Sequence, residues 1–228
     1  MLANNLVRVT FFNSDLDRDI CKYYFEETYV FYSNLPPRNL RGNVYLLCTF
    51  DFEELASKSI FIQSRLIKFF PWRYILNHQY FVYSDYRIDI HPRFFSEIDT
   101  NDFPVFLKHR EDGVYLHELF RNYDRKRISF LDFISFLNLA EGHLKAPISE
   151  NGVICLKKTD YMCFSEFLEY ISKVNRDQLI LPLLIKIPYK YFSCRLDSLK
   201  YFHVNSKKFI LKNFIKRLFG WLYSFFYF

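Results

Sequence analysis

Glycine is scarce in this sequence, and the scarcity excludes one familiar kind of ligand site. Only five glycines are scattered among 228 residues. A glycine-rich phosphate loop of either common kind needs glycines close together, because the backbone has to approach the phosphate. The sequence contains no such loop, and we predict no cofactor.

Cysteines are also few, and their spacing suggests no pairing. An odd number of five is typical of a reducing compartment rather than of a secreted, disulfide-linked protein. No set of cysteines and histidines has zinc spacing, since His143, Cys155 and Cys163 lie too far apart in the chain. We therefore predict no metal site.

Long apolar runs are missing as well. The longest candidate is LFGWLYSFFYF near the C-terminus, which at 11 residues is too short to span a bilayer. The start, MLANNLVRVTFFNSDLDRDI, has no long apolar core and contains three aspartates. It is expected to be neither a signal peptide nor a transit peptide.

Aromatic residues, by contrast, are abundant. The chain has 28 Phe and 18 Tyr, and half of its residues are hydrophobic, so a packed core is expected. Phe, Tyr, Ile, Lys and Asn all have A/T-rich codons. Their abundance indicates an A/T-biased genome, such as that of an organelle, a parasite or a virus.

Positive charge is concentrated towards the C-terminus. Between Lys186 and Arg217, nine Lys and Arg residues stand against the single acid Asp197, so this segment carries +8 and the rest of the chain −2. Such a block favours a polyanionic partner, with nucleic acid ahead of an anionic membrane. A solvated helix face is the alternative.

Residue spacing predicts a helix, a second short helix and a hairpin in the first half of the chain. Apolar residues recur at three- and four-residue intervals from Asp51 to Phe70. Pro71 suits the first turn of a helix that would end near His78. Two strands, 81–83 and 87–90, would follow as a hairpin. Further on, we expect helices over 114–145 and 164–175, an extended segment over 178–192, and a basic amphipathic helix from Lys207.

The stretch WRYILNHQYFVYSDYRIDIHP (72–92) resembles the second helix and hairpin of the S-four RNA-binding module, named for small-subunit ribosomal protein four. Arg73 falls on the family's arginine and His78 on its histidine. FYSNLPPRNLR (31–41) and YFHVNSKKF (201–209) resemble flanking segments in the same order. The resemblance implies an α+β fold, with a helix-helix-hairpin RNA-binding module embedded in a mostly helical chain with a basic C-terminal extension.

Four segments are predicted on this basis: an N-terminal segment, the module, a helical region and a basic, aromatic extension, over 1–50, 51–107, 108–185 and 186–228. Arg73 and Asn77 lie one helical turn apart, with Arg65 and Lys68 just before them, and would contact phosphates and sugar hydroxyls. The predicted RNA-binding residues are Arg65, Lys68, Arg73, Asn77, His78, Arg87, Lys207, Lys208 and Lys212.

The function implied is that of a non-catalytic component of a mitochondrial small ribosomal subunit. Its partners would be small-subunit rRNA and neighbouring ribosomal proteins, with no small-molecule substrate and no membrane. An organelle-encoded chain in the mitochondrial matrix would account for the A/T bias. Two alternatives remain open: a membrane-complex subunit with an interfacial C-terminal helix, and a pseudouridine synthase-like enzyme with Asp197 as its catalytic residue.

Overall fold

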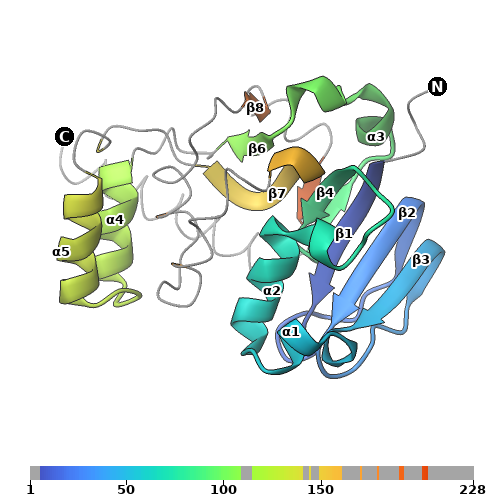
Figure 1. Cartoon of the computed structure of the whole chain (residues 1–228), viewed down its shortest axis with the longest axis horizontal. Helices are drawn as coiled ribbons and strands as arrows, with labels where there is room; N and C mark the ends of the chain where they lie inside the picture. The colour runs from blue at the N-terminus through green and yellow to red at the C-terminus, as the bar shows by residue number, and fades with distance from the viewer. Residues whose placement is uncertain are drawn as a thin grey trace, which may run out of the picture.

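The computed structural model describes residues 6–108, 115–140, 144, 149–160, 170, 179, 190–192 and 202–204. Its centre is a seven-stranded sheet in the order β3-β2-β1-β4-β7-β6-β8, and a smaller sheet pairs β5 with β9 (Figure 1). The strands are β1 (Leu6–Phe12), β2 (Lys22–Tyr32), β3 (Leu40–Cys48), β4 (Tyr80–Ser84), β5 (Ile88–Ile90), β6 (Val105–Lys108), β7 (Ser149–Lys157), β8 (Lys190–Phe192) and β9 (Phe202–Val204).

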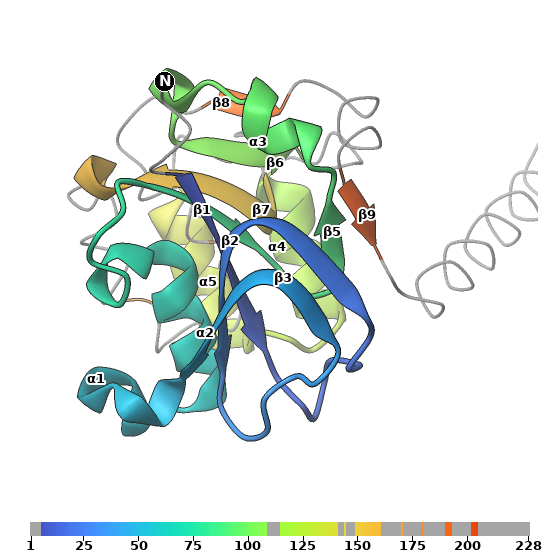
Figure 2. The same cartoon turned by 90° about the vertical axis from the view of Figure 1, so that its right-hand side faces the viewer.

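Short helices connect these strands. The α-helices are α1 (Glu53–Ala56), α2 (Ile60–Phe69), α3 (Arg93–Glu97), α4 (Tyr115–Asp124) and α5 (Phe130–Leu139). Single 3-10 turns are η2 (Thr49–Asp51), η3 (Pro71–Arg73), η4 (Thr100–Asp102) and η5 (Lys158–Asp160). Figure 2 shows α1 and α2 on one side of the large sheet and β5 with β9 on the other.

The order of the strands creates a switch point between β1 and β4. The chain starts in β1, adds β2 and then β3 on one side, and returns to place β4 on the other side of β1. These four strands run parallel to one another. Beyond β4, β7 runs antiparallel to both β4 and β6. The strand order therefore reverses between β1 and β4, and in open parallel sheets ligands bind outside the carboxyl ends of the strands at such a point.

The central strand β1 is buried on both faces, as expected of a parallel strand inside a sheet. Successive side chains point to opposite faces. Val7, Val9 and Phe11 belong to the large core under α2, with exposed fractions between 0% and 6%. On the other face, Phe12 packs in a second core with Tyr24.

Strands β2 and β3 bend strongly, as their arcs in Figure 2 show. Their pairing register shifts between Tyr24 and Thr28, so β2 has extra residues at the bend. Gly42 lies opposite, with a φ of +97°, where a Cβ atom would stand 1.9 Å from the carbonyl oxygen of Tyr24. Only glycine fits this position.

Helix α2 packs against β1. Its N-terminal cap is Ser59, whose side chain accepts a hydrogen bond from the backbone N–H of Ile62. Leu66, Ile67 and Phe69 are at most 4% exposed and belong to the same core as the side chains of β1. The helix thereby fixes where its own amino end lies relative to β1.

The predicted fold class was wrong, although several predicted elements exist. A helix forms at Ile60–Phe69, and α4 and α5 lie within the helical stretch expected over 114–145. The second module helix is missing, since only a 3-10 turn forms at Pro71–Arg73. Strands also form where the hairpin was expected, but β4 pairs with β1 and β7 while β5 pairs with β9.

Other expectations fall partly or wholly outside the described residues. The tail from Lys207 lies outside them, and of the predicted helix over 164–175 only Tyr170 is described. The four predicted segments stay a prediction. The large sheet takes strands from each of them.

Candidate functional site

A pocket opens at the carboxyl ends of β1 and β4, at the switch point. Its volume is about 560 Å³. In Figure 1 the arrowhead of β1 and the first turn of α2 lie towards the same end of the molecule. The lining residues come from these three elements and their adjoining loops: Phe11, Asn13, Leu16, Asp17, Ile60, Phe61, Ser64, Tyr83, Asp85, Tyr86 and Arg87.

The loop after β1 forms a closed turn that brings Asp17 to the pocket. The backbone N–H of Asp17 donates to the carbonyl of Asn13 at 2.7 Å, and the Asp17 carboxylate accepts from the N–H of Asn13 at 2.9 Å. Asn13 also accepts from the N–H of Asp15 through its side chain, at 3.0 Å. Burial raises the pKa of the Asp17 carboxyl above 3.8, while the hydrogen bond from Asn13 and the charge of Arg87 lower it.

A second tight turn follows β4. The N–H of Ile88 donates to the carbonyl of Asp85 at 2.9 Å, so residues 85–88 form a β-turn. The N–H of Asp85 donates to the carbonyl of Gly152 on β7 at 2.8 Å. This turn presents Asp85 at the pocket edge with Arg87, whose side chain is exposed.

Gly152 is needed for close packing beneath this turn. A Cβ atom there would lie 2.8 Å from the Ile88 Cδ1 and 3.4 Å from a carboxylate oxygen of Asp85. A larger residue would push on both ends of the turn.

Buried Arg8 anchors the β4 turn to β1. Its Nε donates to the Ser84 hydroxyl at 3.0 Å, and its Nη2 donates to the carbonyl of Ile88 at 2.7 Å. Its Nη1 forms an ion pair with Glu26 at 3.1 Å, and its guanidinium stacks over the Tyr24 ring at 4.7 Å. Arg8 thus holds both ends of the segment that carries Asp85 and Arg87.

A second buried cation, Lys22, holds the middle of the same segment. Its Nζ donates to the carbonyl of Tyr86 and, at 2.9 Å, to the carboxylate of Asp89. It also lies 4.6 Å from the centre of the Tyr86 ring. Burial lowers the pKa of Lys22 from 10.5, whereas the charge of Asp89 raises it. These contacts fix the shape of the turn before any ligand binds.

The remaining walls combine aromatic rings with the amino end of a helix. Tyr83 is 4% exposed and Phe61 is 38% exposed, so the pocket offers both an enclosed and an accessible ring. Ile60, Phe61 and Ser64 are in the first turns of α2. The helix dipole places partial positive charge at this end.

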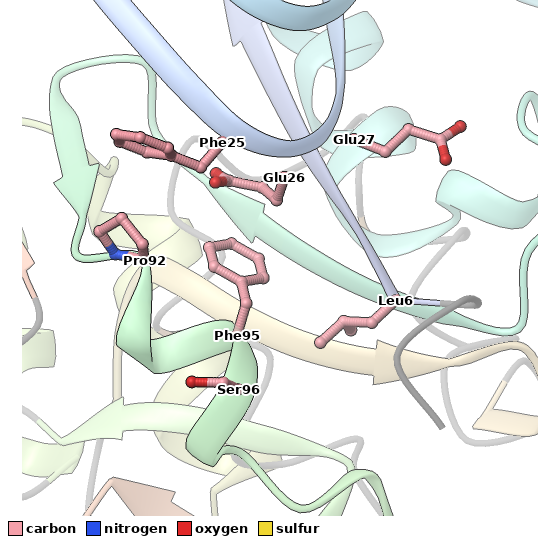
Figure 3. A pocket seen from close by; sticks show the side chains of 7 residues that line it. All are labelled: Leu6, Phe25, Glu26, Glu27, Pro92, Phe95 and Ser96. Carbon is pink, nitrogen blue, oxygen red and sulfur yellow. The ribbon is translucent and has the colours of Figure 1, made fainter. Parts of the chain in front are cut away.

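A second pocket of similar volume lies at the amino end of β1 (Figure 3). The picture shows the rings of Phe25 and Phe95 beside it, with Glu26 between them, while the Glu27 carboxylate points away. Glu26 already pairs with Arg8. Because this pocket lies away from the carboxyl ends of the strands and its central carboxylate is paired, we place the candidate site at the switch point.

The predicted RNA-binding residues that the structure describes lie in different parts of the fold. Arg65 is 6% and Lys68 8% exposed, and both lie against aromatic rings of α2 or β4. Arg73 is at the surface in an ion pair with Glu54. Asn77 is exposed, and Arg87 lines the switch-point pocket. The others, Lys207, Lys208 and Lys212, lie outside the described residues.

His78 is buried in a polar cluster with β2. Its Nε2 lies 3.2 Å from the Tyr29 hydroxyl and 3.3 Å from the Glu27 carboxylate. The Tyr29 hydroxyl donates to Glu27 at 2.7 Å. Burial and this bond raise the pKa of Tyr29. This cluster connects the 74–79 loop to the sheet.

Sequence reasoning missed Arg8, Asn13, Asp17 and Asp85. A signal was present, because both strands that meet at the switch point end in aromatic residues followed closely by Ser and Asp: VRVTFFNSD and FVYSD. Polar residues directly after two buried strands indicate a shared sheet edge. No pattern marked Arg8, which lies in the middle of a hydrophobic strand.

Two searches of known proteins found no relative: no family model matches the chain, and no curated protein matches it. Among solved structures, the galactosyltransferase LgtC in complex with donor and acceptor sugar analogs is similar with a TM-score of 0.44 and 15% identity, over 81% of this chain and 72% of that chain. An active-site mutant of LgtC is similar with a TM-score of 0.44 and 13% identity, over the same shares.

The prediction of a non-catalytic ribosomal protein was wrong. The helix-helix-hairpin on which it depended is not formed by residues 51–107, because only a 3-10 turn follows α2 and the two strands pair with other partners, β4 with β1 and β7 and β5 with β9. The predictions of rRNA and ribosomal-protein partners, and of no small-molecule substrate, were therefore wrong as well. The two alternatives, a membrane-complex subunit and a pseudouridine synthase-like enzyme, are corrected with them. The mitochondrial location stays a prediction.

Among the residues that the structure describes, no helix is long and apolar enough to cross a membrane. The same residues include no group of three or more His, Cys, Asp and Glu side chains that could hold a metal ion.

Proposed function

We propose that this chain is a sugar-transfer enzyme and that its switch-point pocket binds a nucleotide-linked sugar. The observation that carries the proposal is the position of the pocket. It lies outside the carboxyl ends of β1 and β4, where the strand order reverses. In open sheets of parallel strands, ligands bind in this crevice.

The chemistry of the pocket walls supports a nucleotide with a sugar attached. The accessible ring of Phe61 offers apolar surface to a base, and the enclosed Tyr83 borders the same pocket. Arg87 and the amino end of α2 offer positive charge to phosphate groups. Asp17 and Asp85 offer carboxylate oxygens, which accept hydrogen bonds from sugar hydroxyls.

The preorganised turn supports binding without a large rearrangement. Arg8 and Lys22, which do not line the pocket themselves, hold residues 84–89 through hydrogen bonds. A ligand therefore meets Asp85 and Arg87 already in place, and it loses less free energy to ordering the loop. The galactosyltransferase named above was solved in complex with donor and acceptor sugar analogs. For this chain, the ligand class rests on the pocket.

A calorimetric titration tests the binding half of the proposal. Uridine, guanosine, cytidine and adenosine diphosphate sugars would be titrated into the purified chain, with and without Mg²⁺. We expect one of them to bind, and Arg87→Ala or Asp85→Asn to weaken it about tenfold or more, equivalent to about 1.4 kcal/mol. Arg93→Ala is the matched control, because Arg93 is also exposed but does not line this pocket. Binding by none of the four, or equal losses in Arg87→Ala and Arg93→Ala, would contradict the proposal.

A separate assay tests whether the chain transfers the sugar to an acceptor. The same sugar nucleotide would be incubated with mixed oligosaccharide acceptors, and the nucleoside diphosphate released would be measured. Release that depends on acceptor and falls in Asp85→Asn supports transfer. Tight binding with no release would leave a nucleotide-binding protein and overturn the enzymatic part.

A further inference from the structure

The helical pair α4–α5 has an unusual outer face. Figure 1 places α5 at the edge of the molecule, with α4 between it and the sheet. The inner face of α5 is part of the large core, where Phe133 and Phe136 are 8% and 5% exposed. Its outer face exposes Leu131 by 79% and Phe130 by 59%.

The outer face of α5 carries no charged side chain. Its exposed residues are Phe130, Leu131, Ile134, Ser135, Asn138 and Leu139. Asp132, the one acid of the helix, is half-buried and caps the helix start by bonding to the hydroxyl and the N–H of Ser129. A helix face exposed to water normally bears charged residues. An uncharged apolar face of this kind marks a contact surface.

A fixed basic tip adjoins this face. The N–H of Lys126 donates to the carbonyl of Tyr123 at 2.8 Å, and the N–H of Arg127 donates to that of Asn122 at 2.9 Å. Lys126 has a φ of 53°. This is a Schellman ending of α4, and it holds Arg125, Lys126 and Arg127 immediately before the start of α5. The side chains of Arg125 and Lys126 are exposed.

We propose that the outer face of α5 docks on an anionic membrane surface. Phe130, Leu131 and Ile134 would enter the boundary between head groups and acyl chains. Arg125 and Lys126, at the end of the same face, would lie among anionic head groups. The combination favours a lipid surface, because Phe130 and Leu131, the two most exposed apolar side chains of this face, begin three residues after the basic cluster 125–127. This proposal does not depend on the sugar-transfer function.

Co-sedimentation with vesicles tests the surface directly. We expect the full chain to bind vesicles that contain phosphatidylserine at least fivefold more tightly than vesicles of phosphatidylcholine alone. Phe130→Ser with Leu131→Ser should reduce that binding at least fivefold. Leu76→Ser is the control, because Leu76 is 68% exposed elsewhere on the molecule. Arg125→Ala with Lys126→Ala should remove the preference for phosphatidylserine, whereas Arg18→Ala with Arg41→Ala should keep it.

A second variant keeps the proposal falsifiable even if the serine variants fold poorly. Leu131→Trp retains an apolar side chain, and its fluorescence, after subtraction of the wild-type signal, should shift to the blue when vesicles are added. Leu76→Trp should show no shift. Three results would overturn the proposal. The wild type could fail to bind vesicles, the substitutions at positions 130 and 131 could leave vesicle binding unchanged, or the chain could self-associate and bury Leu131 against another copy in place of lipid.

Discussion

The Nη2 of Arg8 donates a hydrogen bond of 2.7 Å to the backbone carbonyl of Ile88, 80 residues further along the chain. This bond joins the centre of β1 to the far end of the turn that lines the switch-point pocket. The side chain of Arg8 is 3% exposed and that of Glu26, its ion-pair partner, 9%. The position of the pocket residues therefore depends on a buried charge pair beneath them.

Replacing Arg8 should destabilise the chain strongly. Arg8→Met leaves the Glu26 carboxylate buried without its partner, so we expect a loss of about 3–5 kcal/mol in the free energy of unfolding. Urea denaturation measures it. The double variant Arg8→Met with Glu26→Gln should lose less than the single variant, because no uncompensated charge remains. A single variant as stable as the wild type would contradict the role of this pair.

Lys22 should make stability depend on pH in alkaline solution. Burial lowers its pKa in the folded chain below 10.5, so between the lowered pKa and 10.5 the unfolded chain binds more protons. The free energy of unfolding contributed by this group then rises with pH over that window. We expect the wild type to gain stability relative to Lys22→Met as pH increases towards 10.5. Subtracting the variant's curve removes the contribution of tyrosines, whose buried members such as Tyr24 have pKa values raised to about 12. A constant difference across the window would contradict the lowered pKa.

Gly42→Ala should damage the bend of β2 and β3. A φ of +97° strains any side chain, at a cost of about 1–3 kcal/mol, and the new Cβ would lie 1.9 Å from the Tyr24 carbonyl oxygen, which forces the backbones apart. Thermal unfolding would show the loss. Gly152→Ala is the comparison: it first meets the movable Cδ1 of Ile88, so its loss should be smaller. Equal losses would show that the bend does not depend on Gly42.

Ser129→Ala should weaken the start of α5. Ser129 accepts from the N–H of Asp132 at 3.1 Å, and Asp132 accepts from the N–H of Ser129, which completes a capping box. We expect a loss of about 1 kcal/mol, measured by urea denaturation. Ser135→Ala, on the exposed face of the same helix, should be neutral or slightly stabilising, because alanine favours helix. A Ser129→Ala variant that matches Ser135→Ala would contradict the cap.

Local patterns in the sequence predicted elements but not their partners. The apolar spacing in 51–70 correctly predicted α2, because a helix that packs on a sheet keeps one apolar side. The alternation after Phe81 correctly predicted strands at β4 and β5. Alternation reveals which residues share a face, but it holds no information on which strand lies alongside. The pairing of β5 with β9, more than 100 residues away, was invisible for this reason.

The site was harder to predict than the fold elements, because burial of a side chain depends on tertiary packing. Arg65 and Lys68 were expected on an exposed ridge, but both are buried, and their charged groups lie over the rings of Phe61 and Tyr83. Of the predicted residues, Arg87 does line the candidate pocket, although it was assigned to RNA. Arg8 and Lys22 were unpredictable as buried cations, because their partners come from distant segments.

The most direct test of the account is a hydrogen–deuterium exchange map of the chain with and without the sugar nucleotide that binds best. The account predicts slower exchange in three separate segments, 13–17, 60–64 and 83–88, all of which contribute residues to the switch-point pocket. Protection confined to 25–27 and 92–96, around the pocket of Figure 3, would move the site to the opposite end of β1 and contradict the central claim. Unchanged exchange in all of these segments would contradict it equally.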